Sequence, residues 1–373
     1  MRDAMGIIYT GDSNVNLQEL TVHRSIAALP FAGRYRVVDF TLSNMINSGV
    51  INVGIITQNN YHSLMDHLDS GKMWDLDRKN GGLFILPPYV SNENTGWYRG
   101  EIEAFHSNMS YIRRSSQKYV VISGSNMVCS LTFQDALDFH KENAADITVI
   151  YKKDEGELAK EFSKHTLIKT DDNNRIWDIE VEPTSPESDK VSMEMYIIEK
   201  RVFEHLVEES FARGKYDFKK DILIQNLSRL KIMGFEYNGY LAKIDSIHSY
   251  FKNNMELLEF NNFQDLFEKS GPVYTKVKDE VPARYGKNST AINSLVADGC
   301  IIDGTVENCI IFRGVKIGKG SHVKNSIIMQ DTEIYDKVEL EHVILDKNVI
   351  IRNGKRLIGQ DNFPVVIRKY SVV

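Results

Sequence analysis

Short apolar runs alternate with amphipathic segments over roughly the first 250 residues of the chain. The runs that predict β-strands are residues 5–9 (MGIIY), 50–58 (VINVGIITQ), 82–88 (GLFILPP), 118–124 (KYVVISG) and 146–153 (DITVIYKK). The segments with helical spacing are residues 39–49, 59–71, 100–117 and 132–144. Strands that alternate with helices predict an α/β, Rossmann-like domain with a mainly parallel sheet and helices on both faces. In such sheets ligands bind beyond the carboxyl ends of the strands.

The pattern changes in the last quarter of the chain. Aliphatic residues recur there at steps of five or six positions, so that a coil of 17 residues repeats. The two clearest columns are Ile311, Ile328 and Leu345, and Ile317, Ile334 and Ile351. A hexapeptide rhythm with three faces per coil predicts a left-handed parallel β-helix. Glycines at positions 299, 304, 314, 318 and 320 suit its corners, where a positive φ is needed.

These two patterns divide the chain into an α/β domain at residues 1–255 and a β-helix domain at residues 291–373. The intervening residues 256–290 contain Pro272 and Pro282 and are interpreted as an extended connector.

Composition narrows the class of protein. The 373 residues carry a net charge of −6, which gives no support for nucleic acid or an anionic membrane as a partner. No apolar run approaches the roughly 20 residues of a membrane span. The three cysteines, Cys129, Cys300 and Cys309, show no metal-binding spacing, and an odd number suits a reducing compartment. We therefore expect a cytoplasmic protein.

A polar loop, YTGDSNVNLQELT, follows the first predicted strand between Tyr9 and Thr21. A loop at that place is typical of phosphate binding, because glycines let backbone N–H groups approach the phosphates. This loop has a single glycine, Gly11, and no basic residue, and it carries the acidic Asp12 and Glu19. Its position favours nucleotide binding, whereas its residue types oppose it.

The segment LTVHRSIAALPFAGRYRVVDFTLSNMINSGV, residues 20–50, resembles a motif of the ADP-glucose pyrophosphorylases, also called glucose-1-phosphate adenylyltransferases. Further similar segments follow in the family's order at residues 97–105, 120–126, 216–224 and 239–258. The resemblance implies a nucleotidyltransferase domain followed by the β-helix. It also implies the family's reaction, in which ATP and glucose-1-phosphate form ADP-glucose and pyrophosphate with a divalent metal, usually Mg²⁺.

The resemblance also shows where this chain departs from the family's substrate-binding residues. In the nucleotide loop Gly11 remains, while Asp12 and Asn14 stand in place of glycines and Asn16 in place of an arginine. Ile26 replaces a lysine. On the sugar-phosphate side Glu103 replaces an aspartate, with Glu101 and Ile102 beside it, and Glu182 replaces a lysine. These changes remove positive charge where phosphates would lie.

The two metal-binding aspartates implied by the family are also replaced, by Ser125 and Lys243. Mg²⁺ prefers one or two carboxylates together with phosphates. An ammonium about 4 Å from the position of a divalent ion would oppose it by roughly 8 kcal/mol at an effective dielectric near 20. Asp245, two residues further on, is a possible substitute ligand, or it forms an ion pair with Lys243.

The resemblance therefore implies a catalytically degenerate, GlgD-type regulatory subunit in glycogen biosynthesis. Such a subunit assembles as a tetramer with an active GlgC-type subunit, which uses ATP and Mg²⁺, while this chain alone binds no cofactor; self-association stays open. Effector binding is implied for the segment with His23, Arg24, Arg34 and Arg36, although each of these is as readily a solvated or sheet-paired basic residue.

Two other functions stay open. The first is an active adenylyltransferase with altered ligands, Glu103, Asn126 and Asp245. The second is a hexapeptide acyltransferase, for which His322 or His342 would serve as general base, against the simpler expectation that both are surface residues.

Overall fold

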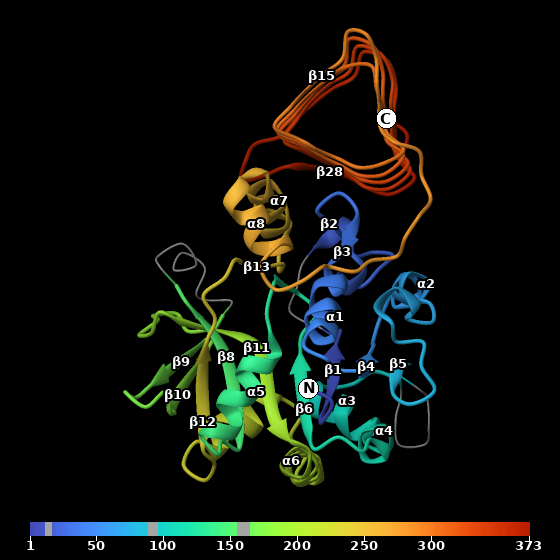
Figure 1. Cartoon of the computed structure of the whole chain (residues 1–373). Coiled ribbons are helices and arrows are strands. Elements are labelled where there is room, and N and C mark those ends of the chain that lie inside the picture. Colours follow the sequence, from blue (N-terminus) through green and yellow to red (C-terminus); the bar gives the residue numbers. More distant parts are fainter. Residues whose placement is uncertain (12–16, 89–95, 155–164) are drawn as a thin grey trace.

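The computed structural model comprises an α/β domain and a three-sided β-helix that stands over one end of it (Figure 1). The structure describes residues 1–11, 17–88, 96–154 and 165–373. Within these residues no helix is long and apolar enough to cross a membrane.

The α/β domain is built on one twisted sheet. Its strands are β1 (Ala4–Tyr9), β4 (Asn52–Ile56), β5 (Gly82–Leu86), β6 (Tyr119–Ser123), β8 (Ile147–Lys153), β9 (Thr166–Thr170), β10 (Ile176–Val181), β11 (Lys190–Glu199) and β12 (Ile232–Glu236). The five strands predicted from the apolar runs are all present. Strands β5, β4, β1 and β6 lie side by side and are parallel, as expected.

The sheet is nevertheless mixed rather than mainly parallel. Strand β11 runs antiparallel to both β6 and β8, and β9 and β10 form an antiparallel pair. The apolar pattern of β11 shows that it is buried, but strand direction depends on the connection that precedes it, which the pattern does not encode.

Helices cover both faces of the sheet (Figure 1). They are α1 (Val37–Asn47), α2 (His62–Leu68), α3 (Glu101–Ser107), α4 (Met109–Arg114), α5 (Phe133–Glu142) and α6 (Lys200–Ala212). Alternate residues of β1 point to opposite faces. Ile7 therefore joins the core under α3, α4 and α6, whereas Ile8 joins the core under α1, α2 and α5.

The predicted connector is partly helical. Helix α7 (Ile247–Met255) is followed by α8 (Phe260–Phe267), and extended backbone begins only after it. In α8, Phe263, Leu266 and Phe267 follow helical spacing, and Leu266 and Phe267 pack into the core between the two domains. The expectation of a wholly extended connector was wrong because Pro272 and Pro282 restrict only the residues around them.

The β-helix forms three parallel five-stranded sheets over residues 284–367, all of which the structure describes. One sheet comprises β14 (Arg284–Tyr285), β17 (Ile301–Ile302), β20 (Lys316–Ile317), β23 (Glu333–Ile334) and β26 (Ile350–Ile351). The second comprises β15 (Thr290–Ile292), β18 (Thr305–Glu307), β21 (His322–Lys324), β24 (Glu339–Glu341) and β27 (Arg356–Ile358). The third comprises β16 (Leu295–Val296), β19 (Ile310–Ile311), β22 (Ile327–Ile328), β25 (Val343–Leu345) and β28 (Val365–Ile367).

The columns predicted from the 17-residue repeat are confirmed. Ile311 pairs with Ile328 and Ile328 with Leu345, and the column that starts at Ile317 behaves in the same way. All of these side chains are buried. A one-per-face aliphatic repeat therefore fixed the register of the coils.

The corners of the β-helix use left-handed backbone, as expected, but not only at glycine. Gly299, Gly314 and Gly320 have positive φ, whereas Gly304 and Gly318 do not and instead pack closely against neighbouring backbone. One column of left-handed corners carries asparagine side chains that bond to one another along the coils, and it ends at His342. Asparagine tolerates this conformation better than most residues.

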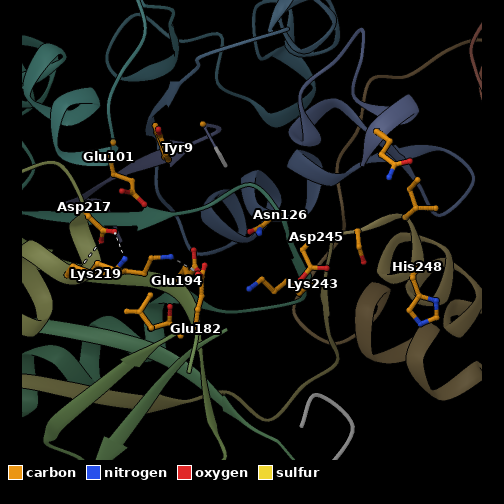
Figure 2. A pocket seen from close by; sticks show the side chains of 18 of the residues that line it. Tyr9, Glu101, Asn126, Glu182, Glu194, Asp217, Lys219, Lys243, Asp245 and His248 are labelled. Carbon is orange, nitrogen blue, oxygen red and sulfur yellow. Dashed lines mark hydrogen bonds and ion pairs between the residues drawn. The ribbon is translucent and has the colours of Figure 1, made fainter. Parts of the chain in front are cut away.

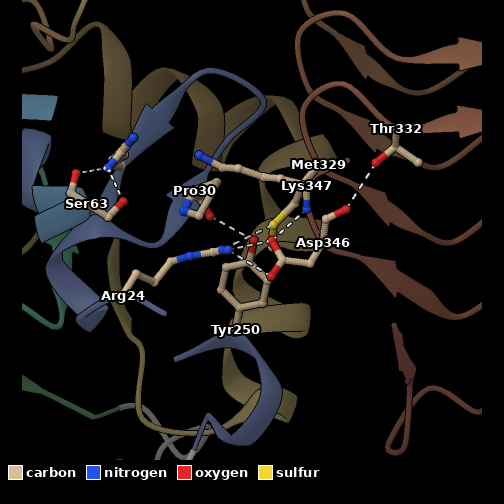
Figure 3. Close-up of polar contacts among 9 residues, drawn as sticks. Arg24, Pro30, Ser63, Tyr250, Met329, Thr332, Asp346 and Lys347 are labelled. Carbon is tan, nitrogen blue, oxygen red and sulfur yellow. Dashed lines mark hydrogen bonds and ion pairs between the residues drawn. The ribbon is translucent and has the colours of Figure 1, made fainter. Parts of the chain in front are cut away.

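The two domains are joined by an apolar interface and one buried ion pair (Figure 3). The Arg24 guanidinium donates to both carboxylate oxygens of Asp346, each at 2.8 Å, across 322 positions of sequence. Both side chains are almost completely buried. Nearby, Tyr250 donates to the carbonyl of Pro30 at 2.8 Å. The ion pair is bidentate and buried, so loss of one member would leave a buried charge without its partner.

We expect the substitution Arg24→Met to lower the free energy of unfolding by about 3–5 kcal/mol, because it leaves the Asp346 carboxylate buried and uncompensated. Urea denaturation followed by fluorescence measures this change. The exposed Arg34 provides the control, and Arg34→Met should change stability little. The double variant Arg24→Met/Asp346→Leu should recover most of the loss. Equal effects of Arg24→Met and Arg34→Met would contradict the role of this pair.

Candidate functional site

A cleft of about 1100 Å³ lies beyond the carboxyl ends of β1 and β6, where an α/β sheet places its ligands. Tyr9 ends β1, Asn126 follows β6, and Glu194 projects from β11 (Figure 2). The β-helix supplies part of the wall through residues 362–364 and Val366. The arrangement of the two domains therefore sets the shape of the cleft.

Acidic side chains outnumber basic ones in the described lining of the cleft. The acidic residues are Glu19, Glu101, Glu182, Glu194, Asp217 and Asp245, and the basic residues are Arg99, Lys219, Lys220 and Lys243. An acidic balance disfavours a ligand with several phosphates.

Most of the basic groups are already paired with carboxylates of this chain. Lys219 donates to Glu194 at 3.2 Å, and Lys220 lies 4.0 Å from Asp217. Burial opposes ionisation of Glu194, but the ammonium groups of Lys219 and Lys243 outweigh it and lower the pKa of this carboxyl. Burial raises the pKa of Glu101, which lies near Lys219 and Glu194. The positive charge of the cleft is thus largely balanced within the protein.

Lys243 ends strand β13 (Leu241–Lys243), which pairs with β7 (Met127–Cys129) and so holds the lysine on the cleft wall. Its ammonium group lies 3.2 Å from Nδ1 of His165. Burial and the Lys243 charge lower the pKa of His165 to about 4, so the imidazole is neutral near pH 7 and can accept from the ammonium.

Ser125, the other position at which the resemblance implies a metal-binding aspartate, is completely buried after β6 and does not line the cleft. The neighbouring Asn126 does line it, as does Asp245, which accepts a hydrogen bond from Ser249 at 3.0 Å. Among the residues that the structure describes, no group of three or more His, Cys, Asp or Glu side chains could hold a metal ion. With Lys243 on the same wall, this donor set does not fit a divalent cation.

Glu103, a candidate substrate residue, lies outside the cleft. It accepts from the backbone N–H of Arg99 at 2.6 Å and from its guanidinium at 2.7 Å, and these bonds lower its pKa. Arg99 also lies over the ring of Tyr216, with its guanidinium carbon 3.9 Å from the ring centroid. Arg99 and Glu103 are four positions apart, a spacing that favours an ion pair between their side chains, so the sequence carried a signal for this contact.

The remaining candidates of the nucleotide and sugar sites fall in different places. Gly11 and Glu182 line the cleft. Ile26 belongs to the apolar core that joins the two domains, with Phe31 and Ile310. The nucleotide-loop positions Asp12, Asn14 and Asn16 lie outside the described residues.

The effector candidates differ in exposure: two are exposed, Arg24 is buried and Arg36 is half-buried. His23 and Arg34 are exposed, whereas Arg24 is committed to Asp346. Arg36 donates to the carbonyl of Ser63 at 2.6 Å, and burial lowers its pKa to about 10. Beside them, burial and the charges of Arg36 and Arg24 lower the pKa of Lys347 to about 6. Basic groups therefore gather at the junction between the domains.

Neither histidine of the acyltransferase hypothesis lies in the main cleft. His322 is exposed on β21. His342 is mostly covered and contacts Asn325 at 3.3 Å at the end of the asparagine column. Both histidines fit structural positions of the β-helix. The expectation of a solvated surface residue holds for His322. The sequence analysis did not foresee that His342 occupies a corner of the β-helix with left-handed backbone.

Glu194 and Thr166, which line the cleft, and His165, which contacts the cleft residue Lys243, were not foreseen from the sequence. Glu194 has a left-handed φ of 54° at an irregularity in β11, between the register positions Ser192 and Met195. A charged residue inside an otherwise apolar strand was the available signal.

Comparison with known proteins gives the family. Residues 5–259 match the nucleotidyl transferase family, and residues 279–364 match the GlmU-like, C-terminal hexapeptide family. The chain is 39% identical to the glycogen biosynthesis protein GlgD of Bacillus subtilis (strain 168), over 98% of this chain and 95% of that protein. It is 33% identical to glucose-1-phosphate adenylyltransferases of Clostridium perfringens (strain SM101 / Type A), over 100% of this chain and 96% of the other, and of Acetivibrio thermocellus, over 97% and 85%.

Fold, cleft and matches define a nucleotidyltransferase domain joined to a hexapeptide β-helix. The chain belongs to the glucose-1-phosphate adenylyltransferase family, and it shares high similarity with a GlgD protein of that family. The family expected from residues 20–50 is confirmed.

The pairing of Lys219 with Glu194 gives a pH-dependent prediction. Lys219→Met should lower the free energy of unfolding at pH 7 by about 2 kcal/mol, between the values for exposed and buried pairs. The pKa of Glu194 is lowered from its ordinary value of 4.5, so the stabilisation is present above that value and is lost as the pH falls. The cost of the substitution should therefore shrink toward pH 4.

The neighbouring Lys220 is the matched control for this measurement. Its side chain is 61% exposed, against 20% for Lys219, and its partner Asp217 lies further away. Lys220→Met should cost less than about 0.5 kcal/mol at any pH. A cost of Lys219→Met that does not change between pH 7 and pH 4 would contradict the assignment of charge to this pair.

Proposed function

We propose that this chain is a regulatory, catalytically silent subunit of ADP-glucose pyrophosphorylase in glycogen biosynthesis. It assembles with an active subunit of the same family, and that subunit uses ATP, glucose-1-phosphate and Mg²⁺. The similarity to a protein named for glycogen biosynthesis supports the pathway. The charges and side chains of the cleft support the lack of catalytic activity.

The observation that carries the proposal is the state of the charges in the cleft. Phosphoryl transfer depends on a metal and on cations that can neutralise developing phosphate charge. Here Lys219 is bonded to Glu194, Lys220 lies near Asp217, and Lys243 lies on the wall where the resemblance implies a metal-binding aspartate. A triphosphate would have to break these pairs and also face the remaining carboxylates.

An active enzyme with altered ligands is the second candidate. It would use Asn126 and Asp245, which share a wall of the cleft. The third ligand it requires, Glu103, is held by Arg99 outside the cleft. Two oxygen donors beside an ammonium group are a weak site for Mg²⁺. The hypothesis of a catalytically silent subunit therefore explains more of the geometry of the cleft than the hypothesis of an active enzyme does.

The purified chain alone should convert ATP and glucose-1-phosphate at less than about one hundredth of the rate of an active homologue, since a hundredfold corresponds to about 2.7 kcal/mol of lost transition-state stabilisation. Pyrophosphate release in the presence of Mg²⁺ measures the rate. Mixed with the active subunit of the same organism, the chain should co-elute on size exclusion and change that subunit's kcat or effector response. Turnover by the chain alone within a hundredfold of the homologue would overturn the proposal.

Reversing the charge at position 243 tests the metal argument separately. We expect Lys243→Asp to tighten Mn²⁺ binding at least a hundredfold, because it removes a repelling charge and adds a carboxylate beside Asn126 and Asp245. Electron paramagnetic resonance of free Mn²⁺ measures binding without any activity. Lys220→Asp makes the same change of charge at an exposed position of the cleft. If both variants tighten binding equally, net charge alone acts and position 243 is not a metal position.

A further inference from the structure

Two unusual backbone segments meet at one ion pair in the cleft. Glu194 lies inside strand β11 with a left-handed φ of 54°, a conformation that few residues other than glycine adopt without strain. Its partner Lys219 belongs to the π-helix η5 (Phe218–Leu223), and helices of this kind are rare and frequently lie at functional sites. Strained backbone persists where the surrounding structure fixes it, and it gathers at active sites, ligand clamps and switch regions. The backbone on both sides of this ion pair therefore points to a role beyond stability.

A small cavity of about 30 Å³ adjoins the cleft at this pair. Four side chains line both the cleft and the small cavity, namely Tyr9, Glu101, Glu194 and Lys219. Three aromatic side chains line the small cavity but not the cleft, namely Phe105, Tyr196 and Phe218. A cavity of this size has room for water but not for a sugar ring. The ion pair therefore lies between the open cleft and a cavity that is too small for a ligand.

The pair is held in this place from both sides. The side chains of Glu194 and Lys219 are 19% and 20% exposed. In front of Lys219, the backbone N–H of Asp217 donates to the carboxylate of Asp221 at 3.0 Å. On the other side, the backbone N–H of Glu194 donates to the hydroxyl of Ser192 at 3.2 Å. Both side chains therefore project from backbone that is fixed by further hydrogen bonds.

The surroundings of Lys219 carry more acidic than basic groups. Three carboxyl groups lie on the same side of the cleft as Lys219 (Figure 2), those of Glu101, Glu194 and Asp217. Burial opposes protonation of Lys219, but the charges of these groups outweigh it and raise the pKa of the lysine. An anion that enters this part of the cleft would therefore meet repulsion as well as filled space.

We infer that the ion pair of Glu194 and Lys219, here called the plug, occupies the inner part of the cleft and excludes a sugar phosphate from it. A site for a sugar ring is concave, with aromatic walls and a few polar groups, and Tyr196, Phe218 and Glu101 around the plug supply such walls. The plug fills this place with two side chains whose charges compensate each other. The inference rests on the proposed function and adds a cause to it: side chains that are present close the cleft, in addition to the replacement of groups that would bind substrate.

Removal of both side chains tests the plug without leaving either charge unpaired. We expect the opened variant, Glu194→Gly/Lys219→Ala, to bind glucose-1-phosphate at least about tenfold more tightly than the wild type, since the ligand no longer has to displace a bond between charged groups. Glycine also relieves the left-handed backbone at position 194. Isothermal titration calorimetry without Mg²⁺ measures the affinity. Glu194→Gly alone keeps Lys219 near Glu101 and Asp217 and should change the affinity in the same direction, so the test does not depend on the folding of the double variant.

A second ion pair beside the plug provides the matched control. Asp217 and Lys220 also line the cleft, lie 4.0 Å apart and are 38% and 61% exposed. Asp217→Asn/Lys220→Ala removes one acidic and one basic group, as the opened variant does, so neither double variant changes the net charge. The control should not tighten binding. Equal tightening by the two double variants, or no tightening by either variant at position 194, would overturn the inference.

Two further measurements separate the plug from charge alone and from catalytic silence. Glu194→Gln keeps the size of the side chain without its charge and should tighten binding less than Glu194→Gly; an equal gain would contradict exclusion by filled space. Pyrophosphate release by the opened variant should stay absent, because the substitutions at positions 125 and 243 are unchanged. Turnover by this variant would count against the proposed function and leave the plug in place, whereas unchanged binding would remove the plug and leave the proposed function.

Discussion

The position of the β-helix on the α/β domain is the constraint on which the site depends. One face of the prism is buried against Phe31, Phe40 and Tyr250, and the ion pair between Arg24 and Asp346 fixes this contact in the dry part of the interface. Because residues 362–364 form part of the cleft wall, any rotation of the β-helix would change the shape of the cleft. A charge pair without its partner is costly in such surroundings, so the interface has a strong preference for one arrangement.

Inside the cleft, the pairing of charged side chains determines which ligands the cleft can bind. A protein that transfers phosphoryl groups keeps cations available for the substrate, and their electrostatic effect is large because the groups are preorganised. In this chain the same kind of groups stabilise the folded protein instead, as in the contact of Lys219 with Glu194. Under the proposed function, charges that the reaction would need are used in the fold, so that stability and the proposed loss of the reaction are linked.

The sequence predicted those features that depend on local repetition. The columns of Ile311 and Ile317 follow from spacing alone, because every coil meets its neighbour in the same register. Contacts between distant segments could not be predicted from the sequence pattern. Arg24 and Asp346 lie 322 positions apart, and the direction of β11 depends on the path of the chain before it. The candidate site was predicted in part, since the positions 182, 243 and 245 do line the cleft. Glu103 lies outside the cleft because Arg99, four positions before it in the same segment, holds its carboxylate.

The two halves of the molecule also explain how the chemistry of the cleft can change, as the proposed function requires, while the architecture is kept. Residues that would bind substrate lie at strand ends and in loops, and few of them contribute to the cores under the helices. Residues that join the domains lie in a separate apolar cluster, in which Ile26 now packs as a core side chain. At position 26, where the resemblance implies a lysine, the isoleucine adds buried apolar area, which favours folding, and offers no charge to a phosphate. Under the proposed function, changes of this kind weaken the reaction and strengthen the scaffold in one step, so the chain can accumulate them without losing its ability to fold.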